Sequence, residues 1–101
     1  MISTDYGRLM ARYNTWQNGS LYGAADTLAD ADRRADRGAF FGSIHATLNH
    51  VLWADRMWMS RFAGTERPEQ NIKTSIALHA DWDDLKAART AFDRVVEDWA
   101  A

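Results

Sequence analysis

The 101-residue sequence has no cysteine, only one proline and no long run of apolar residues. Without cysteine there is no disulfide scaffold, no thiolate zinc cluster and no cysteine nucleophile, and this absence fits a reducing compartment. A membrane-spanning helix needs about 18 consecutive apolar residues, and a secretory signal needs an apolar stretch near the N-terminus. The sequence offers neither, so we expect a cytoplasmic protein without a membrane segment.

An excess of charge of one sign is also lacking. Twelve Lys and Arg residues stand against fourteen Asp and Glu residues, which gives a net charge of −2, and the two signs are interspersed. This balance excludes a basic nucleic-acid surface and a polybasic membrane patch as default interpretations. We therefore expect no nucleic-acid partner. A chain of this length, with 47% apolar residues, has enough material for one core, so residues 1–101 are expected to form a single domain.

Apolar residues at helical spacing predict a first helix from Thr4 or Asp5, two residue types that cap helices, to Leu28. At about 100° per residue its larger side chains fall within one broad arc, which predicts the face turned to the core. The arc comprises Ile2, Tyr6, Leu9, Met10, Tyr13, Trp16, Leu21, Ala24 and Leu28.

A second helix is expected from Ala39 or Ser43 to Ala63, with Gly64 as the residue that ends it. Its apolar residues lie on two opposite sides. A helix that is apolar on two sides must be covered on both, by its own bundle on one side and by a partner or a loop on the other. The main stripe is Phe41, Ile44, Leu48, Val51, Leu52, Met59 and Phe62, and the second stripe is Ala46, His50, Trp53, Ala54 and Met57.

The two connections differ in length. Residues 29–38 are charged and end in glycine, which predicts a solvated connection with one short helical turn. Residues 65–80 contain the only proline, and this segment is long enough to allow a crossover along the bundle.

A third helix is expected from Asp81 to the C-terminus, with Asp83 and Asp84 placed favourably against its dipole. Its apolar residues at spacings of three and four are Leu85, Ala88, Phe92, Val95, Val96 and Trp99. Because no segment alternates with the period of a strand, the fold class that we expect is all-α, a helical bundle.

Three histidines are the candidates for metal or acid–base chemistry. His45 and His50 are five residues apart, which turns a helix by about 140° net, so these two cannot chelate one ion together. His50 has an apolar setting, since Trp53 follows it by one turn; the alternative is an interior histidine bonded to a carbonyl or a side chain. We expect His45 and His79 to be structural or solvated.

Asp55 lies within the main apolar stripe of the second helix, and a buried carboxylate needs a partner. Arg12 or Arg89 could supply one, which favours a structural ion pair over catalysis. The tryptophans and methionines have helical spacing, so we expect them to fill the core. No GxGxxG, GxxxxGK[ST], GxSxG or HExxH motif occurs, so nucleotide, acyl-transfer and zincin chemistry have no support.

Two stretches, YNTWQNGSLYGAADTL (13–28) and DRGAFFGSIHATLNHVLWADRMWMSRFAG (36–64), resemble the first two helices of the damage-inducible DinB family. The resemblance implies an up-down-down-up four-helix bundle, often dimeric, in which three histidines bind a divalent metal, commonly zinc or nickel. Some relatives are thiol transferases. In NHVLWADRMW (49–58) it implies that His50 is one of the three ligands.

The other two ligands of the family lie in an HxxxH pair on a fourth helix, and no residue of 1–101 matches them. We therefore expect a single DinB-like domain that is C-terminally truncated relative to the family and lacks helix 4. Its metal site would be incomplete, with little or no activity as a single copy.

Three long helices shaped for a four-helix core would leave an apolar groove, which predicts a homodimer. The second stripe of the second helix supports a surface that faces a partner. Two alternatives remain open: a metal-dependent thiol transferase whose site is completed across a dimer, and a structural module whose groove binds a helix of another protein.

Overall fold

A computed structural model describes residues 4–38 and 40–101 of the chain, and these residues form helices and no strands. The elements are α1 (Thr4–Asp26), α2 (Asp30–Arg34), α3 (Ile44–Ala63), the short 3-10 helix η1 (Ser75–Ala77) and α4 (Trp82–Ala100). The all-α expectation is confirmed. Within the described ranges, no helix is both long and apolar enough to cross a membrane.

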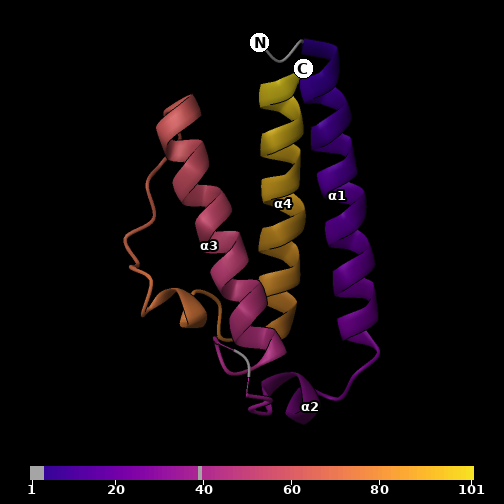
Figure 1. The fold of residues 1–101 in the computed structure, drawn as a ribbon, viewed down its shortest axis with the longest axis vertical. Coiled ribbons are helices and arrows are strands. Elements are labelled where there is room, and N and C mark those ends of the chain that lie inside the picture. The colour runs from indigo at the N-terminus through magenta and orange to yellow at the C-terminus, as the bar shows by residue number, and fades with distance from the viewer. Residues whose placement is uncertain (1–3, 39) are drawn as a thin grey trace.

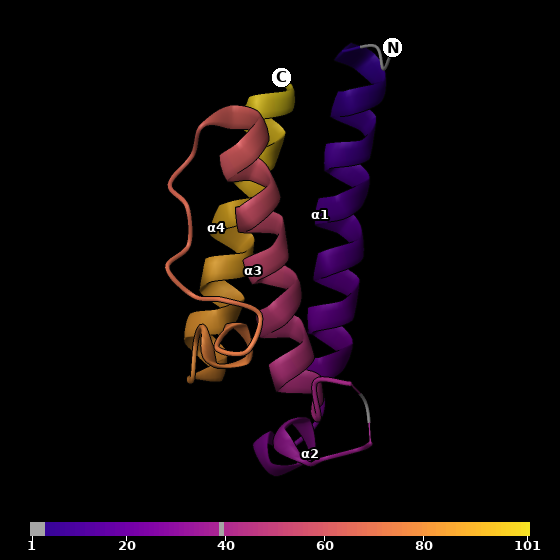
Figure 2. The ribbon, with the colours of Figure 1, turned by 60° about the vertical axis from the view of Figure 1, so that its left-hand side comes forward.

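The three long helices lie side by side, with α4 between α1 and α3 in the view of Figure 1. The chain descends along α1, turns through α2 and ascends along α3. It then runs back along α3 as an extended segment, so that α4 starts at the same end as α3 and runs parallel to it (Figures 1 and 2). The long connection is therefore a crossover, as its length allows.

Local capping sets the ends of α3 and α4. The Ser43 hydroxyl accepts a hydrogen bond from the Ala46 N–H at 3.0 Å, and Gly64 ends α3 in the left-handed region with φ of 69°. Asp81 caps α4 by accepting from the Asp84 N–H at 3.1 Å. Ser43 is thus the correct start of the two that the sequence allows, and Ala39 lies outside the described residues.

The short helix α2 confirms the predicted turn in 29–38, but this connection is not wholly solvated, because Arg33 is buried. Its guanidinium donates to the carbonyls of Ala25, at 3.2 Å, and Leu28, and lies 4.5 Å from the centre of the Trp82 ring. The last carbonyls of a helix have no partner within the helix. Arg33 therefore caps the C-terminal end of α1, which stops at Asp26 rather than at Leu28.

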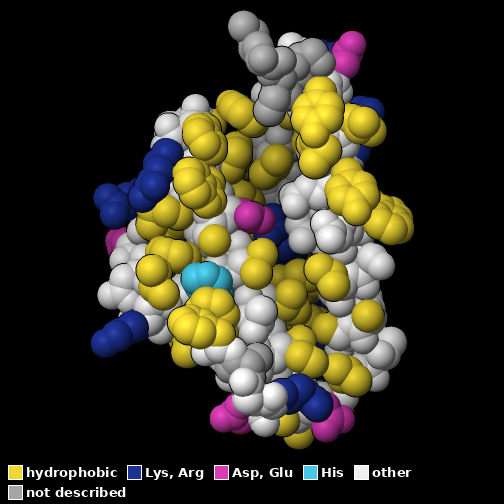
Figure 3. Space-filling model, in the orientation of Figure 1, with side chains coloured by type: hydrophobic (Ala, Val, Ile, Leu, Met, Phe, Trp, Pro, Cys, Tyr) yellow, Lys and Arg dark blue, Asp and Glu magenta, His cyan; other side chains and the backbone are white. Residues whose placement is uncertain are grey.

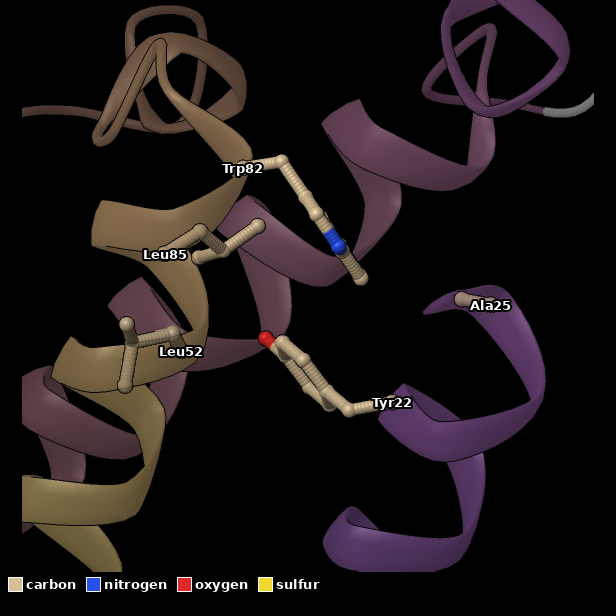
Figure 4. Packing of buried hydrophobic residues seen from close by; sticks show 5 residues of the cluster. All are labelled: Tyr22, Ala25, Leu52, Trp82 and Leu85. Carbon is tan, nitrogen blue, oxygen red and sulfur yellow. The ribbon is translucent and has the colours of Figure 1, made fainter. Parts of the chain in front are cut away.

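The buried core lies at the end of the bundle where α1 ends and α4 begins. Its members are Tyr22, Ala25, Leu52, Trp82 and Leu85, drawn in Figure 4. The Tyr22 and Trp82 rings stack with centroids 5.5 Å apart, and Leu52 and Leu85 are fully buried. One cluster thus fixes all three long helices at this end.

The predicted core face of α1 is wrong. Most of the large side chains in the predicted arc are exposed, and the residues of α1 that are buried are Ala11, Asn18, Tyr22 and Ala25. The physical reason is that α1 packs chiefly on α4, and a helix with one close neighbour buries one narrow strip. Apart from Tyr22, the residues of that strip are small or polar, and a search for apolar spacing passes over them. Of the predicted arc, Tyr6, Leu9, Met10, Tyr13, Trp16 and Leu21 are 45% to 67% exposed, and Ile2 lies outside the described residues.

The expectation that tryptophan and methionine fill the core is correct for Trp53, Trp82 and Met59, which are buried. It is wrong for the other described members that are exposed: Met10, Trp16, Trp58 and Trp99. These four exposed side chains lie on the three long helices and are not part of the core cluster.

We predict that Leu85→Ala lowers the free energy of unfolding by about 2 to 5 kcal/mol, because the fully buried side chain leaves a cavity among three helices. The matched control is Ile72→Ala, at a 60% exposed apolar side chain, which should change it by less than about 0.5 kcal/mol. Urea unfolding followed by circular dichroism measures both. Equal losses in the two variants would contradict the assigned core.

Candidate functional site

His50 lies on α3 in the apolar setting expected from the sequence. Its ring stacks on Phe41, with centroids 3.9 Å apart and planes at 22°, and lies 5.5 Å from the Trp53 ring. Phe41 was expected in the main stripe; because it precedes the first residue of α3, the spacing rule for helices does not apply to it. Two aromatic rings therefore flank the half-buried imidazole.

Ser75 sets the proton position on His50. The Ser75 hydroxyl donates its only proton to the Ile72 carbonyl at 2.7 Å, so towards His50 its oxygen acts as an acceptor. His50 Nδ1 lies 2.9 Å from that oxygen, and with the hydroxyl proton on the Ile72 carbonyl this contact assigns the hydrogen of the neutral ring to Nδ1. Nε2 is left with its lone pair, the form in which histidine binds a metal or accepts a proton.

The second apolar stripe of α3 is covered by residues 65–78, which we call the strap. The Trp53 indole N–H donates to the Gln70 carbonyl at 2.8 Å, and η1 packs on α3 around His50. Of the two covers that the sequence allows, the loop is the one present. The crossover covers this stripe at Trp53 and around His50, whereas Ala46, Ala54 and Met57 are half-buried, so a partner at this stripe stays a prediction.

Asn49 fastens the end of the crossover to α3. Its amide oxygen accepts from the His79 N–H at 2.7 Å, and its amide nitrogen donates to the His79 carbonyl at 3.1 Å. The same carbonyl accepts from His45 Nε2 at 3.0 Å. Asn49 is fully buried and His45 nearly so, which makes both residues structural. His79 enters these contacts through its backbone.

Burial lowers the pKa of His45 below its ordinary value, because desolvation disfavours the charged ring. Burial also lowers the pKa of His79, with a smaller contribution from the nearby charge of Arg56. Both rings are therefore neutral at neutral pH. Neither ring contacts His50 through any bond described above, so the three histidines do not form one site.

The residues present do not assemble the complete metal centre that the resemblance implies. His50 offers one free nitrogen, and its immediate neighbours are two aromatic rings and a hydroxyl that is already engaged. In residues 4–38 and 40–101, no three His, Asp or Glu side chains lie close enough together to hold an ion. Metal ions with histidine ligands normally take three or four protein donors. The described residues of one protomer therefore do not supply a complete metal centre.

A network of polar groups joins the three long helices beside the core. Arg89 on α4 donates from Nη1 to Asp55 on α3 at 2.7 Å and from Nη2 to Asp93 at 2.7 Å. Asn18 on α1 donates to the same Asp93 oxygen at 3.0 Å. The predicted structural ion pair of Asp55 is confirmed with Arg89 as the partner, and Arg12 does not supply it. The Asp55 side chain keeps 35% of its surface exposed, so it is less buried than its place in the stripe suggests.

This network places two carboxylates against one guanidinium. Burial raises the pKa of Asp93, and the interactions with Arg89 and then Asn18 oppose that rise. The Tyr22 side chain lies near these charges, but its hydroxyl is buried without a hydrogen-bond partner among the described residues. Burial raises the pKa of Tyr22 from 10.0 to about 12, since the phenolate would lose its hydration.

Large apolar side chains stand exposed on α1 and α3, on the side where Figure 3 shows a hollow between the two helices. Acidic and basic groups lie inside that hollow, and hydrophobic groups line both of its sides (Figure 3). We call this surface the open face. Its exposed apolar members are Tyr6, Leu9, Met10, Tyr13, Trp16 and Leu21 on α1 and Val51, Trp58 and Phe62 on α3.

Sequence reasoning found His50, Asp55 and Arg89 but missed Ser75 and Asn49. Asn49 had a usable signal, since a polar amide next to His50 in an otherwise apolar helix needs partners once it is buried. Ser75 had none, because its role depends on where the crossover returns to α3. The same holds for Asn18 and Asp93, whose meeting requires α1 and α4 to be neighbours.

We predict that Tyr22→Phe raises the free energy of unfolding by about 1 kcal/mol at neutral pH, because it removes a buried hydroxyl that has no partner. The gain over the natural protein should grow above pH 10. The pKa of Tyr22 is higher in the folded state, about 12, than in the unfolded state, 10.0. The natural protein therefore loses stability as the pH rises from 10.0 towards about 12, because ionisation of Tyr22 favours the unfolded state. The Tyr22→Phe protein does not show this loss, since phenylalanine cannot ionise.

Urea unfolding at neutral and alkaline pH measures this difference, with Tyr13→Phe at a half-exposed tyrosine as the control. A Tyr22→Phe protein that is less stable than the natural one at neutral pH would show that the hydroxyl has a partner.

Comparison with known proteins gives one positive finding. Residues 1–100 match the DinB family. No curated protein and no solved structure gives a significant match. The match extends over the three long helices and both connections between them, and on this basis the chain belongs to the DinB family.

Proposed function

We propose that this DinB-family chain acts as an assembled protein, a homodimer that buries the open face, and that a single copy has little or no activity. The observation that carries the proposal is the concentration of exposed aromatic and aliphatic side chains on α1 and α3. Single exposed apolar residues are normal, but a continuous surface of them marks an interaction site. In a twofold homodimer the same surface serves both partners, so no second type of site is needed.

A divalent metal, zinc or nickel, bound with His50 as one ligand is the second part of the proposal. Support comes from the Nε2 atom, which keeps its lone pair because Nδ1 donates to Ser75. Histidine ligands are commonly oriented in this way by a hydrogen bond to their other nitrogen. Among residues 4–38 and 40–101, no three His, Asp or Glu side chains lie close enough together to hold an ion, so in this proposal the remaining ligands come from a second copy.

A metal-dependent thiol transferase whose site is completed between two copies is the enzymatic form of this proposal. The enzymatic form is favoured by the free Nε2 atom of His50, because a purely structural histidine would not need a free nitrogen. We propose the cytoplasm as the place of action, and no nucleic-acid partner. A structural module that binds a helix of another protein remains the alternative use of the open face, and the oligomeric state separates the two.

We predict that the natural chain sediments as a dimer at micromolar concentration and that Trp16→Glu converts it to a monomer. A charge at this 67% exposed position on the open face would have to be desolvated on association. The matched control is Ile76→Glu on η1, an exposed apolar residue outside the open face, which should leave the dimer intact.

Sedimentation velocity measures all three proteins, and circular dichroism verifies that the variants are folded. A natural chain that is monomeric at micromolar concentration would overturn the dimer and favour the helix-binding alternative. A dimer that survives Trp16→Glu would place the interface elsewhere.

We predict that zinc binds the dimer in competition with a chromophoric chelator, that His50→Ala abolishes this binding, and that Ser75→Ala weakens it by about tenfold. The loss in Ser75→Ala follows because the ring is no longer held with Nε2 free. Arg12→Gln is the control, since the Arg12 side chain is not a metal ligand and takes no part in the contacts of His50. Equal zinc affinity in the natural protein and His50→Ala would remove the proposed ligand.

A further inference from the structure

A cleft separates α3 from the middle of the strap, one turn beyond His50 along the same side of the helix. It is a wide depression, largely open to solvent, with a volume of about 810 Å³. Trp53, Met57 and Arg61 form the wall on α3, and residues 67–73 form the opposite wall. Neither the network of Arg89 nor the open face contributes to it.

Positive charge gathers around this cleft. Arg61, Arg67 and Lys73 line it together with one acidic residue, Glu69, which gives three positive charges against one negative. Among the described residues, none of these three cations has a carboxylate within ion-pair distance, whereas other cations of the chain are paired, such as Lys86 with Asp26 at 2.9 Å. In a chain of net charge −2, a local excess of unpaired cations attracts anions.

The floor of the cleft is apolar and partly fixed. Trp53 is only 9% exposed, and its indole is held by the hydrogen bond to the Gln70 carbonyl. Met57 continues the floor along α3, and on the strap Ile72 leaves 60% of its surface exposed beside it. Arg61 is itself placed by the Trp58 ring, 5.5 Å from its guanidinium carbon. The surface thus pairs a rigid aromatic and aliphatic floor with cations at its rim.

From this arrangement we infer that the cleft binds a small molecule with an apolar body and one anionic group, a carboxylate or a phosphate ester. The body lies on Trp53, Met57 and Ile72, and the anionic group is bound by Arg61 together with Arg67 or Lys73. Arginine suits this role because its planar guanidinium can donate two parallel hydrogen bonds to a carboxylate or a phosphate. The inference does not require the proposed metal, and it shares one residue with the open face, Trp58, which places Arg61.

The test uses the full chain and four compounds: naphthalene-2-carboxylate, naphthyl phosphate, the neutral naphthalene-2-carboxamide and inorganic phosphate. Two-dimensional ¹H–¹⁵N spectra should show shifts of the Trp53 indole N–H and of the backbone amides of residues 67 and 69–73 with the two naphthyl anions. The affinity for both should fall as salt is raised, because the cations are exposed to solvent. The stronger of the two identifies the preferred anionic group.

We expect the neutral amide and inorganic phosphate to bind at least fivefold more weakly than the better naphthyl anion. The amide lacks the anionic group, and inorganic phosphate lacks the apolar body. Arg61→Gln should lower the affinity for that anion by about two- to fivefold. Arg12→Gln, which removes the same charge from α1 far from the cleft, should leave it unchanged.

Three results would overturn the inference. These are equal binding of the anion and the amide, equal affinity in the natural protein and Arg61→Gln, and spectral shifts confined to α1 and α4. Arg61 is exposed, so its replacement should leave the fold intact, and the amide spectrum of the variant verifies this.

Discussion

The arrangement of the three long helices depends on one guanidinium. Arg89 lies on α4, the helix between the other two, and holds a carboxylate of α3 and a carboxylate of its own helix, which in turn accepts from Asn18 of α1. Arg89 is only 3% exposed, and burying its charge destabilises the fold unless its N–H groups have hydrogen-bond partners. Because the groups of this network lie on all three helices, they fix the rotation of each helix about its own axis. The apolar cluster of Tyr22, Leu52 and Leu85 packs beside this network and provides the hydrophobic stabilisation.

The crossover does more than connect α3 to α4. It is fastened at its far end by Asn49 and at its middle by the Trp53 indole, and between these two points it presents Ser75 to His50. One segment thus covers the second apolar side of α3, sets the tautomer of the histidine and forms a wall of the cationic cleft. Because these roles share one backbone path, a change in the strap affects all of them together.

Much of the fold could be predicted from the sequence, because caps and periodicity are local. Ser43, Gly64 and Asp81 mark helix ends through contacts within one turn, and the pairing of Asp55 with an arginine follows from the cost of burying a charge. The burial of α1 could not be predicted in this way. Which side of that helix meets α4 depends on the distant Asp93, and apart from Tyr22 the buried residues of α1 are small or polar. The role of Ser75 could not be predicted either, because its contact with His50 is not local: 25 residues separate the two along the chain.

The exposure of the tryptophans has a consequence for how the protein can be observed. Trp16, Trp58 and Trp99 are each more than half exposed, whereas Trp53 and Trp82 are buried. Indole emission shifts to shorter wavelength when water is removed from the ring. The intrinsic fluorescence of this chain therefore combines two signals. Emission from the two buried rings reports unfolding, and emission from the three exposed rings reports the binding of any molecule that covers them.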